Sequence, residues 1–307
     1  MKVAIAGAGD LGHYIIEELL AAKHEVVVLS RTSKPWLAEL PVDFRSTDYS
    51  VADLTAALHD CDGLVSAILD YTQKSATVHL ALLEACRRSP KCKRYIPSEY
   101  GGNIDEYPQQ PTFYYPNHEP VRAALRQQKD VMWTLFNPGW LTDYLIPPDL
   151  RYIKDIGLFH PVDLQQGTVT IPGDGEDGIA FTPSRDVAKA LARLFSCEEK
   201  WEETIYVCGE TTTWNHIAAV LQSRYGRQFT VSYKSRDELE QQVAAAESEG
   251  SVLAAQFGFW SISGASKLPQ AKLERHKENF FRDVKFRTVE EFLDDAERMG
   301  DAKTPAV

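Results

Sequence analysis

The stretch Val3-Ala4-Ile5-Ala6-Gly7-Ala8-Gly9-Asp10-Leu11-Gly12 near the start of the chain decides the predicted fold. Its first four residues are apolar and typical of a buried strand, and its glycines fit the pattern G-x-G-x-x-G. A second apolar run follows at residues 26–29. Between the two runs, apolar residues recur at helical spacing, and these are Leu11, Ile15, Ile16, Leu19 and Leu20. The sequence therefore predicts a strand, a glycine turn, a helix and a second strand.

Each glycine in this turn has a separate predicted role. Gly7 permits the tight turn, Gly9 lets the backbone approach a pyrophosphate, and Gly12 lets the helix pack closely on the strand. The N–H groups at the start of the helix, including those of Asp10 and Leu11, then face the phosphates. An ordinary glycine turn is the alternative. Because the pattern lies between a strand and a helix, we predict a dinucleotide-binding site.

The end of the second strand indicates which dinucleotide binds. An NAD site normally carries Asp or Glu there to bind the ribose 2′-hydroxyl, whereas this chain has Ser30-Arg31-Thr32-Ser33-Lys34. No carboxylate repels a 2′-phosphate at this point, and Arg31 and Lys34 are available to bind one. The sequence therefore favours NADP(H) as the cofactor, although Arg31 also fits the role of a solvated loop cation.

The whole chain sets limits on the class of protein. Its 307 residues are enough for one extended α/β domain or for a nucleotide domain with a smaller lobe. A net charge of −11 without a basic stripe argues against nucleic-acid binding. The five cysteines are scattered and the histidines form no ligand motif, so we expect reduced thiols and no metal. Without a signal-peptide pattern or an apolar run of membrane length, we expect a cytoplasmic protein that does not contact membranes.

Strand and helix patterns alternate along the first half of the chain and return in the second half. We expect an α/β fold with a Rossmann-type doubly wound parallel sheet formed by residues 1–155 and completed by about 179–210. A smaller mixed α/β substrate lobe is expected from about 156–178 and 211–307. Ser184 is the expected N-cap of one helix, and further helices are predicted at residues 214–225, 235–247 and 289–299.

Two polar residues lie just after predicted strands, at the carboxyl edge where ligands bind in an open parallel sheet. Asp48 is a candidate adenine contact, and an ordinary loop position is equally compatible with it. Ser98 is a candidate contact to the coenzyme or to a substrate oxygen, whereas the neighbouring Glu99 is expected to order the loop. The long loop at residues 103–116 is a candidate lid or binding loop.

Several segments together resemble one known family. These are Gly7 to Gly12, Leu29-Ser30-Arg31, Asp53-Leu54 with Ala56-Ala57-Leu58, Lys93-Arg94-Tyr95-Ile96-Pro97-Ser98-Glu99-Tyr100-Gly101, Ile171-Pro172-Gly173-Asp174-Gly175 with Phe181, Asp186, Val187 and Ala188, and Val284-Lys285-Phe286 with Thr288-Val289-Glu290-Glu291-Phe292-Leu293. The chain resembles the NmrA-like, isoflavone-reductase-like family of atypical short-chain dehydrogenases/reductases over nearly its entire length. It departs from the family at Ala6, where many members have another glycine.

The resemblance implies an oxidoreductase that passes hydride from NADPH to an aromatic or quinone-like small molecule. The family has a Lys at the start of the helix after the long loop, which binds the nicotinamide ribose or handles a proton. In this chain His118 falls at that position, and Tyr114 lies four residues before it. The chain thus has Tyr-x-x-x-His where ordinary short-chain dehydrogenases have Tyr-x-x-x-Lys.

Tyr114 and His118 are the candidate catalytic residues, because residues four apart share one face of a helix. Reduction of a carbonyl leaves an alkoxide that needs a proton, and histidine side chains ordinarily titrate at about 6.5 while tyrosine hydroxyls titrate at about 10. His118 is therefore a candidate acid or a group that polarises Tyr114. It is also compatible with capping the helix or binding ribose, and Asn117 is a possible N-cap ahead of Pro120.

The resemblance also implies where the nicotinamide and the substrate lie. In related dehydrogenases a Pro-Gly turn passes beside the nicotinamide, which here implies backbone contact at Pro138 and Gly139. Aromatic residues near these positions are expected to line the substrate side of the site. These residues are Tyr100, Tyr115, Trp140 and Tyr144. For Trp140 the alternative is a position in the core, and for Tyr114 the alternative to an acid is a residue of the pocket wall.

We therefore predict an NADPH-dependent reductase, of the kind found in secondary metabolism, that acts on a small aromatic or polyketide-like carbonyl, enone or quinone. One alternative is a redox sensor of the NmrA type that binds NADP(H) without turnover, and a protein partner is expected only for this alternative. Another is a non-redox isomerase or dehydratase that uses His118 as a base.

Overall fold

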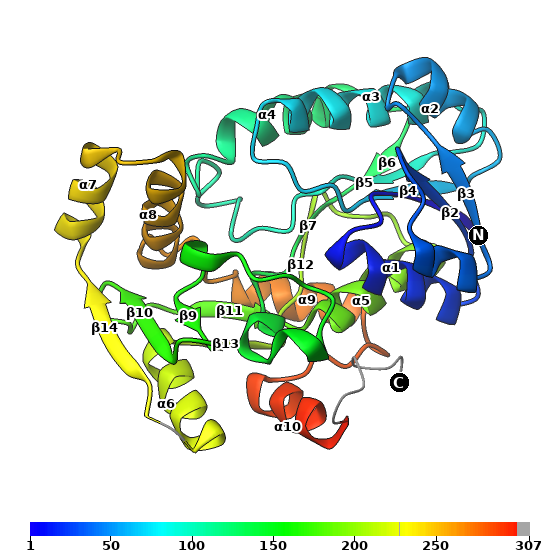
Figure 1. Cartoon of the computed structure of the whole chain (residues 1–307). Helices are drawn as coiled ribbons and strands as arrows, with labels where there is room; N and C mark the ends of the chain where they lie inside the picture. Colours follow the sequence, from blue (N-terminus) through cyan, green and yellow to red (C-terminus); the bar gives the residue numbers. More distant parts are fainter. Residues whose placement is uncertain (227, 300–307) are drawn as a thin grey trace.

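The computed structural model describes residues 1–226 and 228–299 (Figure 1). Its strands are β1 (Lys2–Ala6), β2 (Glu25–Ser30), β3 (Val42–Ser46), β4 (Gly63–Ser66), β5 (Arg94–Ile96), β6 (Met132–Trp133), β7 (Leu135–Asn137), β8 (Trp140–Leu141), β9 (Val162–Asp163), β10 (Thr168–Pro172), β11 (Ile179–Thr182), β12 (Thr204–Tyr206), β13 (Glu210–Thr212) and β14 (Thr230–Lys234). Its α-helices are α1 (Asp10–Ala21), α2 (Val51–Ala57), α3 (Lys74–Arg88), α4 (Tyr115–Gln127), α5 (Ser184–Ser196), α6 (Trp214–Tyr225), α7 (Arg236–Ala245), α8 (Glu249–Ile262), α9 (Gln270–Phe280) and α10 (Val289–Met299). Short 3₁₀ helices lie at Pro35–Glu39, Thr142–Leu145, Pro148–Leu150 and Gly157–Phe159.

A parallel sheet of strand order β3-β2-β1-β4-β5-β6 forms the centre of the molecule. β1 lies between β2 and β4, with Ala6 paired to Leu29 on one side and to Ser66 on the other. The chain reverses its direction of travel across the sheet between β3 and β4, so a topological switch point lies beside β1, where such sheets bind ligands. The predicted Rossmann-type doubly wound α/β fold is therefore confirmed.

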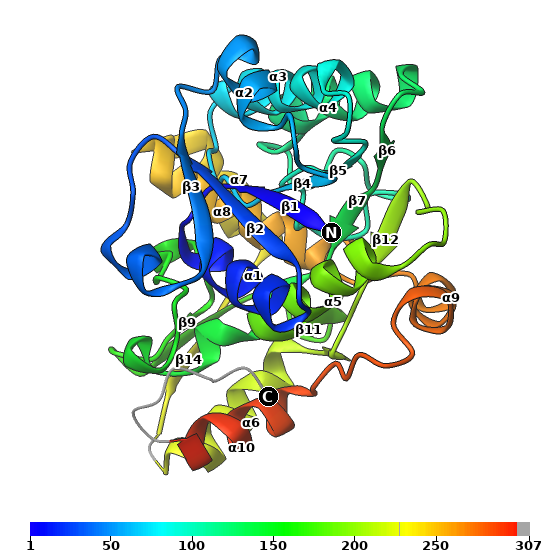
Figure 2. The same cartoon turned by 90° about the vertical axis from the view of Figure 1, so that its right-hand side faces the viewer.

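Helices cover both faces of this sheet (Figures 1 and 2). Ile5 and Val28 belong to the apolar core that includes residues of α1 and α5. Ala4 and Leu29, which neighbour Ile5 and Val28 on the two strands, belong to the core on the side of α2, α3 and α4. The alternation follows from strand geometry, in which successive side chains point to opposite faces. Because both faces are buried, the two strands are continuous apolar runs.

The sheet arrangement after β6 differs in part from the expectation. β12 pairs in parallel with β7, which follows β6 after Thr134 alone, so residues 204–206 extend the sheet region as expected. Residues 179–182 were also expected there, but they form β11, which pairs with β8 and β13 in a separate small sheet. α5, which follows β11, still packs on α1. The boundary between the predicted domain and lobe stays a prediction.

The second half of the chain contains elements that the periodicity does not reveal. β14 pairs in parallel with β10, and α7 and α8 form a hairpin beside this small sheet (Figure 1). The bounds of α6 and α10 agree with the predicted helices, whereas β14, α8 and α9 were not predicted. Ser184 is the first residue of α5 and not its N-cap, which is Pro183.

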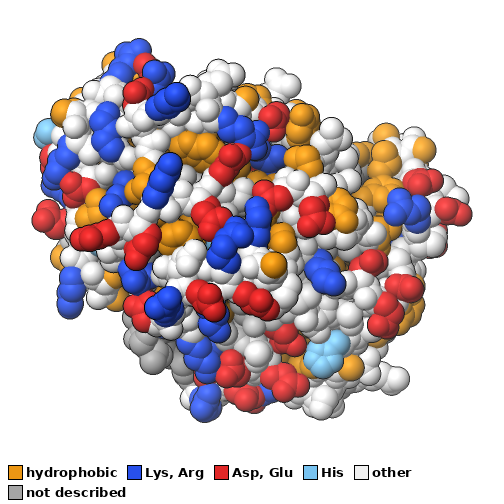
Figure 3. Space-filling view, turned by 180° about the vertical axis from the view of Figure 1, so that it is seen from behind, with side chains coloured by type: hydrophobic (Ala, Val, Ile, Leu, Met, Phe, Trp, Pro, Cys, Tyr) orange, Lys and Arg blue, Asp and Glu red, His pale blue; other side chains and the backbone are white. Residues whose placement is uncertain are grey.

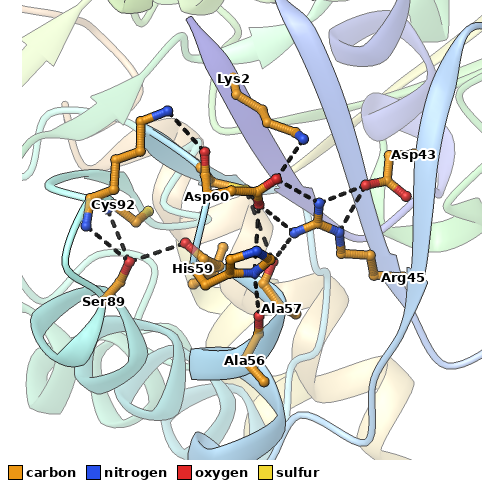
Figure 4. A network of polar contacts seen from close by, with 12 residues as sticks. Lys2, Asp43, Arg45, Ala56, Ala57, His59, Asp60, Ser89 and Cys92 are labelled. Atoms are coloured by element: carbon orange, nitrogen blue, oxygen red, sulfur yellow. Dashed lines mark hydrogen bonds and ion pairs between the residues drawn. The ribbon is translucent and has the colours of Figure 1, made fainter.

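The start of β1 is fixed by a network of charged side chains (Figure 4). Arg45 of β3 binds Asp43 at 2.6 Å and Asp60 at 2.6 Å, and the Lys2 ammonium lies 2.6 Å from Asp60. These hydrogen bonds hold the pKa of the Asp60 carboxyl well below its usual range. The network joins β1, β3 and the turn after α2. It lies at the start of β1, whereas the glycine turn follows the end of this strand.

The glycine turn itself depends on a very close contact. Gly7 has φ +98°, a conformation that favours glycine. A Cβ atom on Gly12 would lie 2.3 Å from the carbonyl oxygen of Gly7. A Cβ on Gly9 would have no heavy atom of the described residues within 4 Å. The turn is therefore tight on the side of Gly12 and open on the side of Gly9.

This difference gives a prediction for the two alanine variants. Gly12→Ala forces Cβ against main-chain oxygen, so we expect the free energy of unfolding to fall by about 2 kcal/mol or more. Gly9→Ala is the matched control, and its stability is expected to stay within about 1 kcal/mol of the wild type. Urea denaturation followed by circular dichroism measures both. Equal stability of the two variants would contradict the close packing of α1.

Candidate active site

The glycine turn forms a cradle for a phosphate group. α1 begins at Asp10 with Gly9 as its N-cap, and no side chain of the described residues caps it. The first N–H groups of a helix have no partners within the helix, and the helix dipole favours an anion at this end. With open space over Gly9, the backbone at Gly9, Asp10 and Leu11 fits the pyrophosphate of a dinucleotide.

The two predicted cations both lie in the segment after β2 and are exposed. The Arg31 guanidinium lies 5.7 Å from the centre of the Tyr49 ring, and the Tyr49 hydroxyl donates to the carbonyl of Leu29 at 3.0 Å. Lys34 precedes the 3₁₀ helix Pro35–Glu39 and lines a cavity that also includes Gly9. Tyr49, which the sequence analysis did not single out, therefore supports Arg31 beside the end of β2.

Asp48 forms hydrogen bonds within its own loop. Its carboxylate accepts from the N–H of Ser50 at 2.7 Å, and its N–H donates to Asp53. The hydrogen bond from Ser50 lowers the pKa of the Asp48 carboxyl. These contacts correspond to the loop role left open from the sequence, and the adenine contact stays a prediction.

His118 and Tyr114 lie together at the start of α4, as their spacing predicts. Their ring centres are 4.6 Å apart. Nδ1 of His118 lies 3.0 Å from the carbonyl oxygen of Tyr114, and Nε2 lies 3.2 Å from that of Ser98. A neutral imidazole donates to one of these carbonyls, whereas a protonated imidazole donates to both. The contact with Ser98 places His118 at the carboxyl edge of the sheet, next to β5.

Tyr114 is poorly suited to lose a proton. Burial raises the pKa of the Tyr114 hydroxyl well above its ordinary value, and the neighbouring Tyr71, Tyr144 and Glu99 raise it further. Tyr114 therefore keeps its hydroxyl proton at neutral pH. It is also the N-cap of α4, so the suggested N-cap role of Asn117 is wrong. The Asn117 amide donates instead to the carbonyls of Tyr71 and Phe113.

A buried ion pair holds the region beneath His118. Arg122 of α4 contacts Glu99 at 2.5 Å, and the two side chains are 2% and 3% exposed. Arg122 also donates to the carbonyl of Pro108 at 2.7 Å. Burial acts to raise the pKa of the Glu99 carboxyl, but Arg122, with His118 and His79, holds it below its ordinary value. Arg122 therefore connects the long loop to α4, and Glu99 takes part in the expected ordering of the loop only by holding the Arg122 guanidinium.

The Pro138–Gly139 turn is occupied by contacts within the protein. The N–H of Gly139 donates to the carbonyl of Gly101 at 3.0 Å, and the Thr182 hydroxyl donates to the carbonyl of Pro138 at 2.6 Å. Gly139 has φ +72°, and a Cβ atom there would lie 2.5 Å from the carbonyl of Ala180. Close packing against β11 therefore explains why a glycine lies at position 139. The predicted contact with the nicotinamide stays a prediction.

The four predicted substrate residues have different surroundings, and their substrate role stays a prediction. The Tyr100 hydroxyl donates to the carbonyl of Ser66 at 2.8 Å inside the sheet, and burial raises its pKa. Tyr115 is the half-buried first residue of α4. Trp140 is 4% exposed, and its ring lies 5.0 Å from that of Trp260, which corresponds to the core position left open. Tyr144 lines a separate cavity of about 680 Å³.

An aromatic cluster that the sequence analysis missed surrounds Tyr114 instead. Tyr71, from the loop after β4, lies 5.4 Å from Phe113 and 6.0 Å from Tyr114 between ring centres. Phe257 of α8 lies 4.9 Å from Phe113, and Phe159 lies 5.7 Å from Phe257. Phe257 is not among the predicted site residues, and Tyr71 and Phe159 lie in segments without a local sequence pattern. The cluster covers the catalytic candidates with apolar surface.

Charged side chains of both signs are mixed on one face of the molecule. Figure 3 shows acidic and basic side chains interspersed over the face opposite to that of Figure 1. Within the described residues, no group of three or more His, Cys, Asp and Glu side chains has the geometry to hold a metal ion. In the same part of the chain, no helix has both the length and the apolar composition that crossing a bilayer requires.

Comparison with known proteins agrees with this arrangement. The model of the NmrA-like family matches residues 1–293. The chain belongs to the NmrA-like family. Oxidoreductase swnR of Arthroderma benhamiae, a full-length relative, is 43% identical over 95% of this chain and 96% of its own. The family named from the sequence motifs, a family of oxidoreductases of the atypical short-chain type, is thereby confirmed.

Solved structures show the same fold. AtPrR2 with NADP⁺ and (+)-pinoresinol has a TM-score of 0.76 at 20% identity and covers 95% of this chain and 97% of its own. The complex of leucoanthocyanidin reductase with NADPH from Vitis vinifera has a TM-score of 0.74 at 20% identity, with 95% and 98% covered. The NmrA-like fold thus extends over both the sheet and the smaller lobe of this chain.

The buried pair gives a prediction for stability. Arg122→Met leaves the Glu99 carboxylate buried without its cation, so we expect the free energy of unfolding to fall by about 3–5 kcal/mol. The double variant Glu99→Leu/Arg122→Met removes both charges and is expected to recover part of this loss. Because folding lowers the pKa of Glu99, its contribution is present above the unfolded value of about 4.3 and is lost as the pH falls through the folded value.

Urea titrations of the wild type, Arg122→Met and the double variant at pH 7 and at about pH 3 measure these changes. A double variant that is less stable than the single variant at pH 7 would show that the pair is not the cause.

Proposed function

We propose that this protein is an NADPH-dependent reductase of a small aromatic or polyketide-like carbonyl, enone or quinone. The observation that carries the proposal is that the glycine turn and the pair Tyr114–His118 lie at the carboxyl edge of one sheet. A dinucleotide held at the turn reaches across this edge in sheets of this type. The apolar cluster of Tyr71, Phe113 and Phe257 then borders the reacting end.

The coenzyme assignment is supported by the residues after β2. Arg31 and Lys34 are exposed, and residues 30–34 contain no carboxylate. The swnR relative is called an oxidoreductase, and the two structural neighbours were solved with NADP⁺ or NADPH. The names pinoresinol and leucoanthocyanidin in those structures are those of aromatic compounds, which supports an aromatic substrate for this chain as well.

Bound NADPH supplies the hydride in such a reaction. For a carbonyl substrate, the C=O electron pair moves to oxygen, which then takes a proton. We assign this proton to His118, which gives up one of its two carbonyl contacts to reach the substrate oxygen. Tyr114, whose pKa is raised, keeps its proton and orients the substrate oxygen. The contact between Nε2 and Ser98 holds the imidazole at the sheet edge, and the aromatic cluster excludes water.

A coenzyme-binding sensor is the second candidate, and one observation favours it. Both ring nitrogens of His118 face main-chain carbonyls of the protein, so neither is free for a substrate in this conformation. A sensor binds NADPH without oxidising it, whereas an isomerase or dehydratase turns over without NADPH. These behaviours separate the three functions.

The first test of the proposal is coenzyme binding. We expect the wild type to bind NADPH more tightly than NADH, and Arg31→Asp to weaken NADPH binding by about tenfold or more by replacing attraction to the 2′-phosphate with repulsion. Isothermal titration calorimetry measures both affinities. Lys129→Asp, at an exposed position before β6, is the control for the change in charge. An unchanged coenzyme preference in Arg31→Asp would contradict the assignment.

The second test is turnover. We expect NADPH oxidation, followed at 340 nm, with at least one member of a panel of quinones, enones and aromatic carbonyls. With that substrate, His118→Ala is expected to lower kcat by about 100-fold with little effect on NADPH affinity, because a positioned acid contributes a factor of this size. Tyr114→Phe keeps the ring and is expected to change kcat less. Binding without oxidation across the panel would favour the sensor, and unchanged kcat in His118→Ala would remove the proton assignment.

A further inference from the structure

A cavity of about 530 Å³ lies beside the glycine turn. Its walls come from three separate parts of the chain. Ala8, Gly9 and Asp10 form one wall, Lys34 and Trp36 form the second, and residues 148–155 contribute the third. We call residues 148–155 the strap, because this segment crosses from the smaller sheets to the first turn of α1.

The strap is fixed to α1 by a stack of three rings. The His13 ring lies between those of Trp36 and Tyr152, at 3.7 and 3.6 Å between centres and with interplanar angles of 8° and 7°. The Tyr152 hydroxyl donates to Glu17 at 3.0 Å, and its N–H donates to the Tyr14 hydroxyl oxygen at 3.0 Å. Side chains and backbone therefore hold the strap in one position against the helix.

Arg151 stiffens the strap from within. Its side chain is 1% exposed, and its guanidinium donates to the carbonyls of Ile146 and Ile153 and to the carboxylate of Asp155. Each guanidinium nitrogen thus has a partner in the protein. Arg151 shapes the cavity wall, and its charge is already neutralised.

Lys154 is placed differently. Its N–H donates to the carboxylate of Asp10 at 2.9 Å, while its ammonium lies 3.7 Å from the same carboxylate on a side chain that is 85% exposed. Asp10 is the first residue of α1, and its negative charge beside the glycine turn repels a phosphate. Lys154 offsets this charge, and Lys34 supplies a second cation from the opposite wall.

We propose that the strap is part of the coenzyme site. In this proposal, Lys154 and Lys34 bind the 2′-phosphate on the adenosine ribose of NADPH. Lys154 is then a determinant of coenzyme preference, in addition to Arg31, which stacks on Tyr49 and does not line this cavity. The inference rests on the proposed function, because it requires that the glycine turn binds a dinucleotide. It adds a specificity residue that lies more than a hundred residues away from the turn.

The test measures affinity for NADPH and NADH by calorimetry in wild type and Lys154→Met. Loss of the contact to the 2′-phosphate is expected to raise the Kd for NADPH about tenfold. The Kd for NADH is expected to rise by less, because NADH lacks that phosphate and is affected only by the uncompensated charge of Asp10. The contact is exposed, so the preference of the wild type for NADPH is expected to fall as salt is raised, and less so in the variant. Lys129→Met removes an exposed cation at the start of the β6 region and is the matched control.

A second variant tests the strap itself. Tyr152→Leu removes one outer ring of the stack, so both coenzymes are expected to bind more weakly and the strap to become more accessible to protease.

An NADPH affinity in Lys154→Met equal to wild type, or equal losses for both coenzymes, would overturn the assignment of Lys154. Unchanged binding of both coenzymes in Tyr152→Leu would overturn the strap as a wall of the site. A wild type that binds neither coenzyme would overturn the proposed function, which distinguishes that failure from the others.

Discussion

The structure depends on the close approach of α1 to the turn after β1. Gly12 packs so tightly on the Gly7 carbonyl that any side chain at this position would meet main-chain oxygen. The contact sets the direction in which α1 leaves the sheet, and thereby the position of its first N–H groups. α5 also packs on α1, and the strap contacts the first turns of α1. The phosphate cradle, the main core and the strap therefore share one helix.

The sequence predicts the sheet well because its information is local. Apolar runs such as residues 3–6 and 26–29 form strands that are buried on both faces, and the glycine pattern has meaning only between such a strand and a helix. The same locality brings Tyr114 and His118 together, since four residues make one helical turn. β11 was misplaced because strand partners depend on contacts far apart in the sequence, and an apolar tetrapeptide does not specify its neighbour.

The surroundings of the site depend on such distant contacts and are therefore hard to predict. The aromatic cluster comes from two loops, a 3₁₀ helix and α8, and none of its residues is part of a motif. These residues are Tyr71, Phe113, Phe159 and Phe257. The buried partners of Glu99 and Tyr100 likewise come from other elements. Aromatic residues near a sheet edge can pack inward or line a pocket. Which of these two roles an aromatic residue has depends on its packing against distant parts of the chain.

The ring stack also has a consequence for synthesis of the protein. Tyr152 is separated from its hydrogen-bond partner Tyr14 by 138 positions, so the ribosome must translate half of the polypeptide before this contact can form. A nascent chain carrying the first strands can begin to collapse earlier, because those strands pair with near neighbours. Until then, the face of the His13 ring on which Tyr152 stacks lacks this partner. Nascent chains shorter than about 150 residues thus expose a surface to which chaperones can bind.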